Sequence, residues 1–163
     1  MRIIKEDIFE IDTMESFYGN LILFNNNLII PYINLGLSDH ILNKSDKLKF
    51  IDYCYIIAEK INYLKLNKDV IIENNKRDST AYSLYLGGLG IGDITGIFDM
   101  EIQAKKLYLM YFEDYRLADL ENMWKPSTYL DSKSNMDMER VNVFIRNKNL
   151  ALELRRVLED SFL

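Results

Sequence analysis

The apolar positions of this chain fall mostly into short runs that are typical of β-strands. The clearest pair spans residues 21–33, where two apolar runs flank Asn25, Asn26 and Asn27, a residue type that tolerates positive φ. This pattern predicts a β-hairpin. Pro31 lies inside the second run and has no N–H to donate, so we expect that strand to lie at a sheet edge or to carry a bulge that interrupts the ladder.

Residues 48–65 fit two patterns. Phe50, Cys54 and Ile57 recur, with Ile61 and Leu64, at the spacing of a helical stripe. Aromatic and β-branched side chains nevertheless dominate the stretch, and these lose rotamer freedom in a helix but pack well on a pleated sheet. We therefore favour strand for residues 48–65, with helix as the alternative.

The middle of the chain has the same strand character. Further strands are expected at residues 69–73, 80–86, 97–103 and 106–112. Residues 86–96 hold five of the seven glycines, and here we expect a flexible or tightly turning connection in which glycine supplies positive φ or close backbone approach. A phosphate-binding loop does not fit, because Asp93 stands where a third glycine would follow Gly88 and Gly90.

The pattern changes toward the C-terminus. Residues 119–126 break the strand pattern and residues 127–135 are rich in turn formers, which predicts a long exposed loop. Alternation over residues 141–146 then favours a strand. A final helix is expected after Asn147 or Asn149 as N-cap. Its apolar stripe would comprise Leu150, Leu154, Val157 and Leu158.

Together these elements predict a single α+β domain over residues 1–163. We expect a strand-rich, mostly antiparallel sheet, arranged as a sandwich or half-barrel, with a C-terminal α-helix. An apolar content of 48% with 12% aromatic residues is ample for a core.

Composition indicates the cellular compartment of the protein. Acidic residues near the amino terminus argue against a signal peptide, and no apolar run approaches the roughly 20 residues of a membrane-spanning helix. The single cysteine, Cys54, cannot form an internal disulfide, and its apolar neighbours suggest burial. We therefore expect a cytoplasmic protein that neither crosses nor binds a membrane.

The net charge of −5 limits the choice of partner. A general phosphate-binding surface needs clustered Lys and Arg, so nucleic acid is not an expected partner. The acidic excess is compatible with a basic protein partner.

Catalytic motifs are lacking in the sequence. His40 is the single histidine and lies in a loop-like segment, where a surface position is expected. One Cys and one His exclude ordinary Cys/His zinc sites, and no EF-hand spacing is present. We expect no catalytic residue, metal ion or cofactor, and therefore not an enzyme. The enzymatic alternative would need carboxylates alone, such as Asp93 and Asp99.

One stretch mixes acids with aromatic residues, as protein-binding surfaces often do. We define the acidic–aromatic surface as Glu113, Asp114, Tyr115, Asp119, Glu121 and Trp124. The alternative is a solvated loop in which Tyr115 and Trp124 fold inward.

The opening part of the chain carries a resemblance. Residues 9–17 and 21–37, with the continuation from His40 to Tyr55, resemble small bacterial immunity proteins of polymorphic toxin systems. This resemblance implies a cytoplasmic protein that binds and blocks a cognate toxin domain. Nucleases delivered by contact-dependent growth inhibition are one class of such toxins. The resemblance transfers neither catalytic nor interface residues.

Two functional hypotheses follow. The first is an immunity protein, a stoichiometric inhibitor whose acidic–aromatic surface occludes a basic active site. The second is a small-ligand-binding β-domain without catalysis, in which several of the eleven tyrosines line an interior pocket. The sequence is neutral between a monomer and a homodimer.

Overall fold

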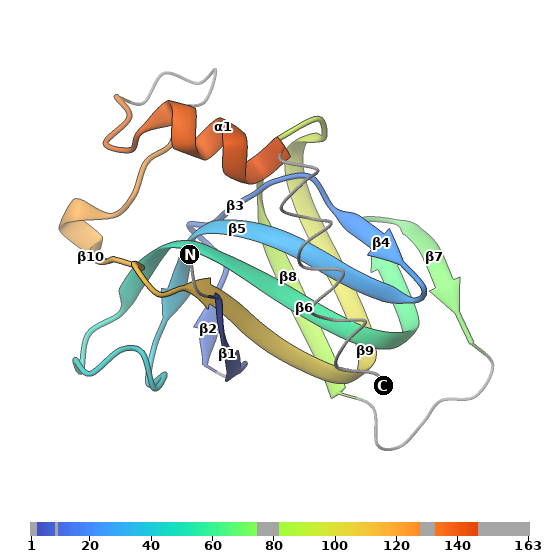
Figure 1. The fold of residues 1–163 in the computed structure, drawn as a ribbon. Coiled ribbons are helices and arrows are strands. Elements are labelled where there is room, and N and C mark those ends of the chain that lie inside the picture. The colour runs from blue at the N-terminus through green and yellow to red at the C-terminus, as the bar shows by residue number, and fades with distance from the viewer. Residues whose placement is uncertain (1–2, 9, 75–81, 128–132, 147–163) are drawn as a thin grey trace.

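The computed structural model describes residues 3–8, 10–74, 82–127 and 133–146 (Figure 1). The strands are β1 (Ile3–Asp7), β2 (Ile11–Asp12), β3 (Phe17–Tyr18), β4 (Ile22–Phe24), β5 (Asn27–Leu37), β6 (Lys49–Leu66), β7 (Asp69–Glu73), β8 (Tyr82–Ile91), β9 (Thr95–Phe112) and β10 (Leu117–Asp119). A 3₁₀ turn, η1 (Leu120–Asn122), and an α-helix, α1 (Met138–Arg146), follow. The strand-rich α+β class expected from the sequence is confirmed.

The sheet curls until its pairing closes on itself. Going round, β5 pairs with β6, β6 with β9, β9 with β8, β8 with β3, and β3 with β5. The β3–β8 pair is parallel, whereas the other four are antiparallel. The architecture is therefore a small barrel, more closed than the half-barrel that was one of the two expected arrangements, and the shorter strands extend its walls.

The predicted hairpin is confirmed as β4–β5. Phe24 pairs with Asn27, and the two residues between them, Asn25 and Asn26, have φ values of 48° and 60°. A two-residue turn with positive φ at both positions matches the twist of the flanking strands.

The edge position expected around Pro31 is wrong, because β5 has neighbours on both sides. Pro31 stays in register with Tyr55 of β6. On its other side the partner strand changes from β3 to β4, and the Gly19 N–H donates to the Pro31 carbonyl at 2.9 Å. The missing proline N–H thus falls where the ladder is already interrupted.

Residues 48–65 form a strand, as favoured. The two longest strands, β6 and β9, pair along most of their length. Both faces of the central part of β6 are buried, one in the barrel interior and one in an outer cluster beneath α1. Alternate residues enter the two clusters: Cys54, Ile56 and Ala58 the interior one, and Tyr53, Tyr55 and Ile57 the outer one. Burial on both faces explains the unbroken apolar run.

The strand expected over residues 141–146 is wrong, because these residues belong to α1. The buried positions are Val141, Phe144 and Ile145, which is the spacing of one helical face. Phe144 packs with ring centroids 5.0 Å from both Tyr53 and Tyr55.

The start of α1 is capped. Asp137 Oδ1 accepts a hydrogen bond from the Glu139 N–H at 3.0 Å. In Figure 1 the helix lies across one end of the barrel wall. The final helix predicted beyond Asn147 lies outside the described residues.

The glycine-rich segment is mostly strand, not a connecting loop. Residues 82–91 form β8, in register with β9, and only residues 92–94 turn. The reason is close approach. A Cβ on Gly90 would lie 2.3 Å from the Ile94 carbonyl and 2.8 Å from the Tyr18 hydroxyl. Glycine is thus needed where β8 passes the interior ring of Tyr18.

The barrel wall supplies a first test. Replacing Gly90 by Ala should lower the free energy of unfolding by about 1–3 kcal/mol, because the added methyl group overlaps backbone and a buried ring. Gly87→Ala is the matched control. Its Cβ would lie no closer than 3.4 Å to any neighbour, so a change within about 0.5 kcal/mol is expected. Chemical denaturation of both variants measures this, and equal losses would contradict it.

Candidate functional site

The acidic–aromatic surface begins where β9 ends. Glu113 and Asp114 lie in the turn between β9 and β10, Asp119 is the last residue of β10, and Glu121 lies in η1. These four acids are exposed. The loop expected over residues 119–126 therefore starts as a strand end and a 3₁₀ turn, and residues 128–132 of the expected loop lie outside the described part.

A buried carboxylate anchors this turn to the barrel. Asp52 of β6 is fully buried, and its Oδ1 accepts hydrogen bonds from the backbone N–H of Tyr53 at 2.9 Å and of Arg116 at 3.1 Å. The Arg116 carbonyl accepts from the Asp52 N–H at 3.1 Å. The chain on either side of Arg116 is thus fixed on β6.

Asp52 carries an electrostatic cost. Burial raises the pKa of its carboxyl, and the hydrogen bonds from Arg116 and Tyr53, with the charges of Arg140 and Arg116, offset this only in part. Its Oδ2 accepts no hydrogen bond, although the Arg116 Nε lies 3.6 Å away.

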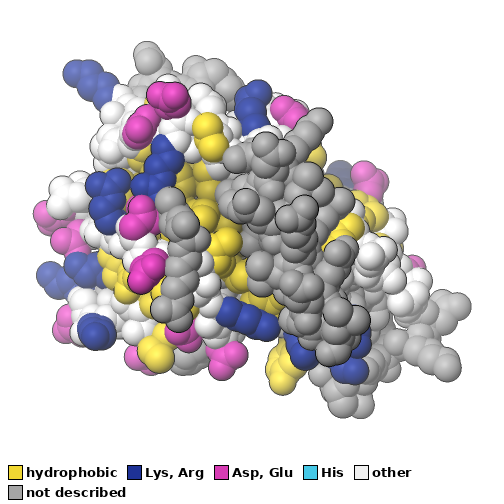
Figure 2. Space-filling view, viewed as in Figure 1, with side chains coloured by type: hydrophobic (Ala, Val, Ile, Leu, Met, Phe, Trp, Pro, Cys, Tyr) yellow, Lys and Arg dark blue, Asp and Glu magenta, His cyan; other side chains and the backbone are white. Residues whose placement is uncertain are grey.

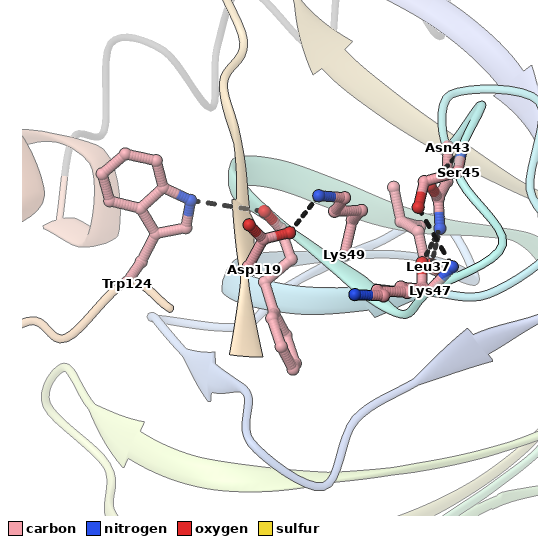
Figure 3. Close-up of polar contacts among 8 residues, drawn as sticks. Leu37, Asn43, Ser45, Lys47, Lys49, Asp119 and Trp124 are labelled. Carbon is pink, nitrogen blue, oxygen red and sulfur yellow. Dashed lines mark hydrogen bonds and ion pairs between the residues drawn. The ribbon is translucent and has the colours of Figure 1, made fainter. Parts of the chain in front are cut away.

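The two aromatic residues of the surface pack against the domain. The Tyr115 ring meets the Tyr111 ring edge-on at a centroid distance of 5.0 Å. The Trp124 indole Nε1 donates to the Phe50 carbonyl at 3.3 Å (Figure 3), and the Arg116 guanidinium lies 4.8 Å from the indole ring centre. Both rings are half-buried, so part of each faces solvent. This placement agrees with the inward alternative.

Two of the four acids have cationic partners from distant parts of the chain. Asp114 pairs with Arg140 of α1 at 3.3 Å, and Asp119 pairs with Lys49 of β6 (Figure 3). Within the described ranges, neither Glu113 nor Glu121 has an ion pair. Figure 2 shows Lys and Arg side chains interspersed with Asp and Glu on the side where β10 lies. The surface is therefore mixed in charge, with two acids left to face a partner.

The surface position expected for His40 is wrong, because the side chain is 2% exposed. Its Nδ1 accepts the Leu42 N–H at 3.2 Å, and its Nε2 lies 3.0 Å from the Asp7 carbonyl. The imidazole thus satisfies backbone groups of two neighbouring segments. Cys54 is buried as expected, and burial raises the pKa of its thiol.

Among the described residues, no group of three or more His, Cys, Asp or Glu side chains is placed to share a metal ion. The carboxylates named for the enzymatic alternative have other neighbours. Asp93 accepts from the Asn20 amide at 2.9 Å, and the Asp99 backbone N–H donates to the Asn67 Oδ1 at 2.9 Å.

The ligand-binding alternative expected an interior pocket lined by tyrosines. The largest fully buried tyrosines, Tyr18, Tyr32, Tyr53 and Tyr55, instead pack within the two apolar clusters. A hollow of about 590 Å³ opens between β1 and β8, which both pair with β9, beside Lys5, Tyr82, Lys106 and Tyr108.

Sequence reasoning missed a smaller hollow of about 90 Å³ at the junction of β6, β7 and β9. Its lining comprises Asn62, Tyr63, Glu73, Asn74, Glu101 and Gln103. A second hollow of about 310 Å³ adjoins it at Glu101. These residues are far apart in sequence, and strand register alone brings them together.

No protein-family model, no curated protein and no solved structure matches this chain. Within the described ranges, no helix combines the length and hydropathy needed to cross a membrane.

The anchoring carboxylate gives a second prediction. Asp52→Ala should lower the free energy of unfolding by about 1–3 kcal/mol, because the N–H groups of Tyr53 and Arg116 lose their acceptor. Asp52→Asn keeps an acceptor oxygen and removes the buried charge, so it should cost less at neutral pH.

The pH dependence distinguishes the two effects. Because the folded-state pKa of Asp52 is raised, the wild type should lose stability relative to Asp52→Asn as pH rises from about 4, the ordinary Asp pKa, through the folded pKa. Denaturation across this range measures the difference. A difference independent of pH would contradict it.

Proposed function

We propose that this chain is an immunity protein that binds and neutralises a cognate basic toxin domain in the cytoplasm of the producing cell. The observation that carries the proposal is the fixed position of the acidic–aromatic surface. Asp52 clamps the backbone at Arg116, and Trp124 is hydrogen-bonded to β5 and β6 through Asn34 and Phe50.

A surface held in this way loses little conformational entropy when a partner binds. The exposed carboxylates of Glu113 and Glu121 are then presented at set positions, on the same surface as the half-buried Trp124. Aromatic anchors bordered by charges are typical of tight protein interfaces. The rigid barrel supports a role as a stoichiometric blocker.

Charge supports the same proposal. The net charge of −5 favours encounter with a basic domain, and association with such a partner should slow as salt increases. The pairing of Asp114 and Asp119 with cations leaves fewer free charges at the surface itself. Steering should therefore come from the whole molecule as well as from this surface.

A direct test is affinity capture of the tagged protein with the product of the adjacent upstream reading frame, followed by toxicity of that product with and without this chain. The proposal expects a one-to-one complex and rescue of growth. A complex without rescue, or rescue without a complex, would contradict direct inhibition.

The surface assignment has its own test, in the captured complex. Neutralising Glu113, Asp114, Asp119 and Glu121 to their amides should slow association about tenfold at low salt. The matched control removes the same four charges at exposed acids elsewhere: Glu10, Glu15, Asp39 and Asp69. Stopped-flow association rates compare the two. Equal slowing would mean that net charge acts, and that the surface lies elsewhere.

A second candidate function rests on the hollow of about 590 Å³, a size that suits a small ligand. Two lysines, Lys5 and Lys106, outnumber the one acid, Asp7, in the lining, and with the Tyr82 ring they favour an anionic aromatic compound. Native mass spectrometry of the purified protein would reveal a retained ligand. Loss of that ligand from the Lys106→Gln variant would favour this function over the first.

A further inference from the structure

The small hollow at the junction of β6, β7 and β9 collects hydrogen-bond acceptors from three strands. Tyr63 of β6 pairs with Glu73 of β7 on one side and with Gln103 of β9 on the other. Cross-strand partners point to the same face of a sheet, and Glu101 lies two residues from Gln103 on that face. The two carboxylates therefore flank Tyr63 from opposite sides.

The lining holds amide donors as well as acceptors, and Lys65 of β6 stands across the ladder from Glu101. One acceptor nevertheless has no donor. Asn62 Oδ1 is buried and accepts no hydrogen bond. One oxygen of Glu101 accepts the Tyr85 hydroxyl at 3.2 Å, and within the described part neither Glu73 nor Glu101 has an ion pair. A buried acceptor without a donor costs free energy, and a ligand with several donors would relieve that cost.

We propose that this hollow binds the guanidinium group of an arginine side chain presented by the partner protein. A guanidinium is flat, always charged, and carries five N–H donors in a fixed fork, which suits two carboxylates and an amide oxygen around a narrow space. A volume of about 90 Å³ holds the end of one side chain and is well below that of a drug-sized ligand site. The Tyr63 ring offers a face for stacking.

The surroundings favour a protein as the source of the arginine. On the same outward face, Tyr85 is 72% exposed and Ile97 is 83% exposed. The adjoining hollow of about 310 Å³ adds the carboxylate of Asp99 beside Tyr85, with Lys65 as its one cation. Exposed aromatic and apolar side chains bordered by acids are complementary to a basic protein surface. That this arginine belongs to a toxin rests on the proposed function.

The test uses a probe that needs no partner. N-acetyl-L-arginine N′-methylamide is titrated into the ¹⁵N-labelled protein, with the lysine analogue and free L-arginine in parallel. The capped arginine should produce saturable shifts at the amides of residues 62–63, 73–74 and 101–103. The lysine analogue should bind several-fold more weakly, because it lacks the planar fork.

Free arginine distinguishes a protein side chain from a small molecule as the source. It carries an α-ammonium and an α-carboxylate where the capped form has peptide groups, so a site that binds only the guanidinium should bind it no more tightly than the capped form. Tighter binding of free arginine would overturn the assignment to a partner's side chain. The absence of saturable shifts, or shifts clustered at residues 113–121, would overturn the site.

Matched variants complete the test. Glu101→Gln and Glu73→Gln keep side-chain shape and should each weaken the capped arginine about tenfold, because each removes one charged acceptor. Glu113→Gln removes the same charge at the acidic–aromatic surface and should leave affinity unchanged. Failure here leaves toxin capture and growth rescue unaffected, so the two proposals fail separately.

Discussion

The burial of β6 on both faces is the constraint on which the rest of this structure depends. The strand β6 pairs with β5 along one edge and with β9 along the other, so its backbone N–H and C=O groups have hydrogen-bond partners on both sides. Any acid in its central part must then find a fixed partner. Asp52 finds the backbone of Arg116, and Glu59 accepts the Tyr108 hydroxyl at 2.5 Å. The same burial that stabilises the barrel thereby fixes the turn that carries Glu113 and Asp114.

Closure of the barrel depends on tyrosines that reach glycine backbone. The Tyr32 hydroxyl donates to the Gly87 carbonyl at 2.8 Å, and the Tyr18 ring lies where a side chain at Gly90 would stand. A short parallel pair, β3 with β8, would bury little by itself. Side-chain to backbone contacts across the seam therefore supply what the two-residue ladder lacks. The glycine-rich sequence reflects this packing.

Much of the fold could be predicted where local pattern and tertiary context agree. The β4–β5 hairpin follows from asparagines that accept positive φ, and the strand at 48–65 from side chains that suit a pleated surface. The strand predicted over residues 141–146 was wrong because so short a segment fits two patterns. It satisfies both a period of two and the helical spacing of Val141, Phe144 and Ile145. The connecting loop predicted at the glycines of β8 was wrong for another reason. Their role is set by Tyr18, which lies more than sixty residues away, and no local rule contains that contact.

The candidate sites show why charge in a sequence is a weak guide to charge on a surface. The closely spaced acids at 113–121 looked like a single anionic surface, yet Lys49 and Arg140 reach two of them from β6 and α1. Glu73 and Glu101 are separated by 28 residues and carried no motif, but strand register places Glu73 opposite Tyr63 and Glu101 opposite Lys65, so both line the same hollow. A sheet joins residues across strands and not along them, so anionic sites on its face are assembled by pairing. Glu73 lies opposite Tyr63, whereas Glu101 lies between Tyr85 and Lys65 and makes no ion pair within the described residues, so both carboxylates keep their charge for a ligand.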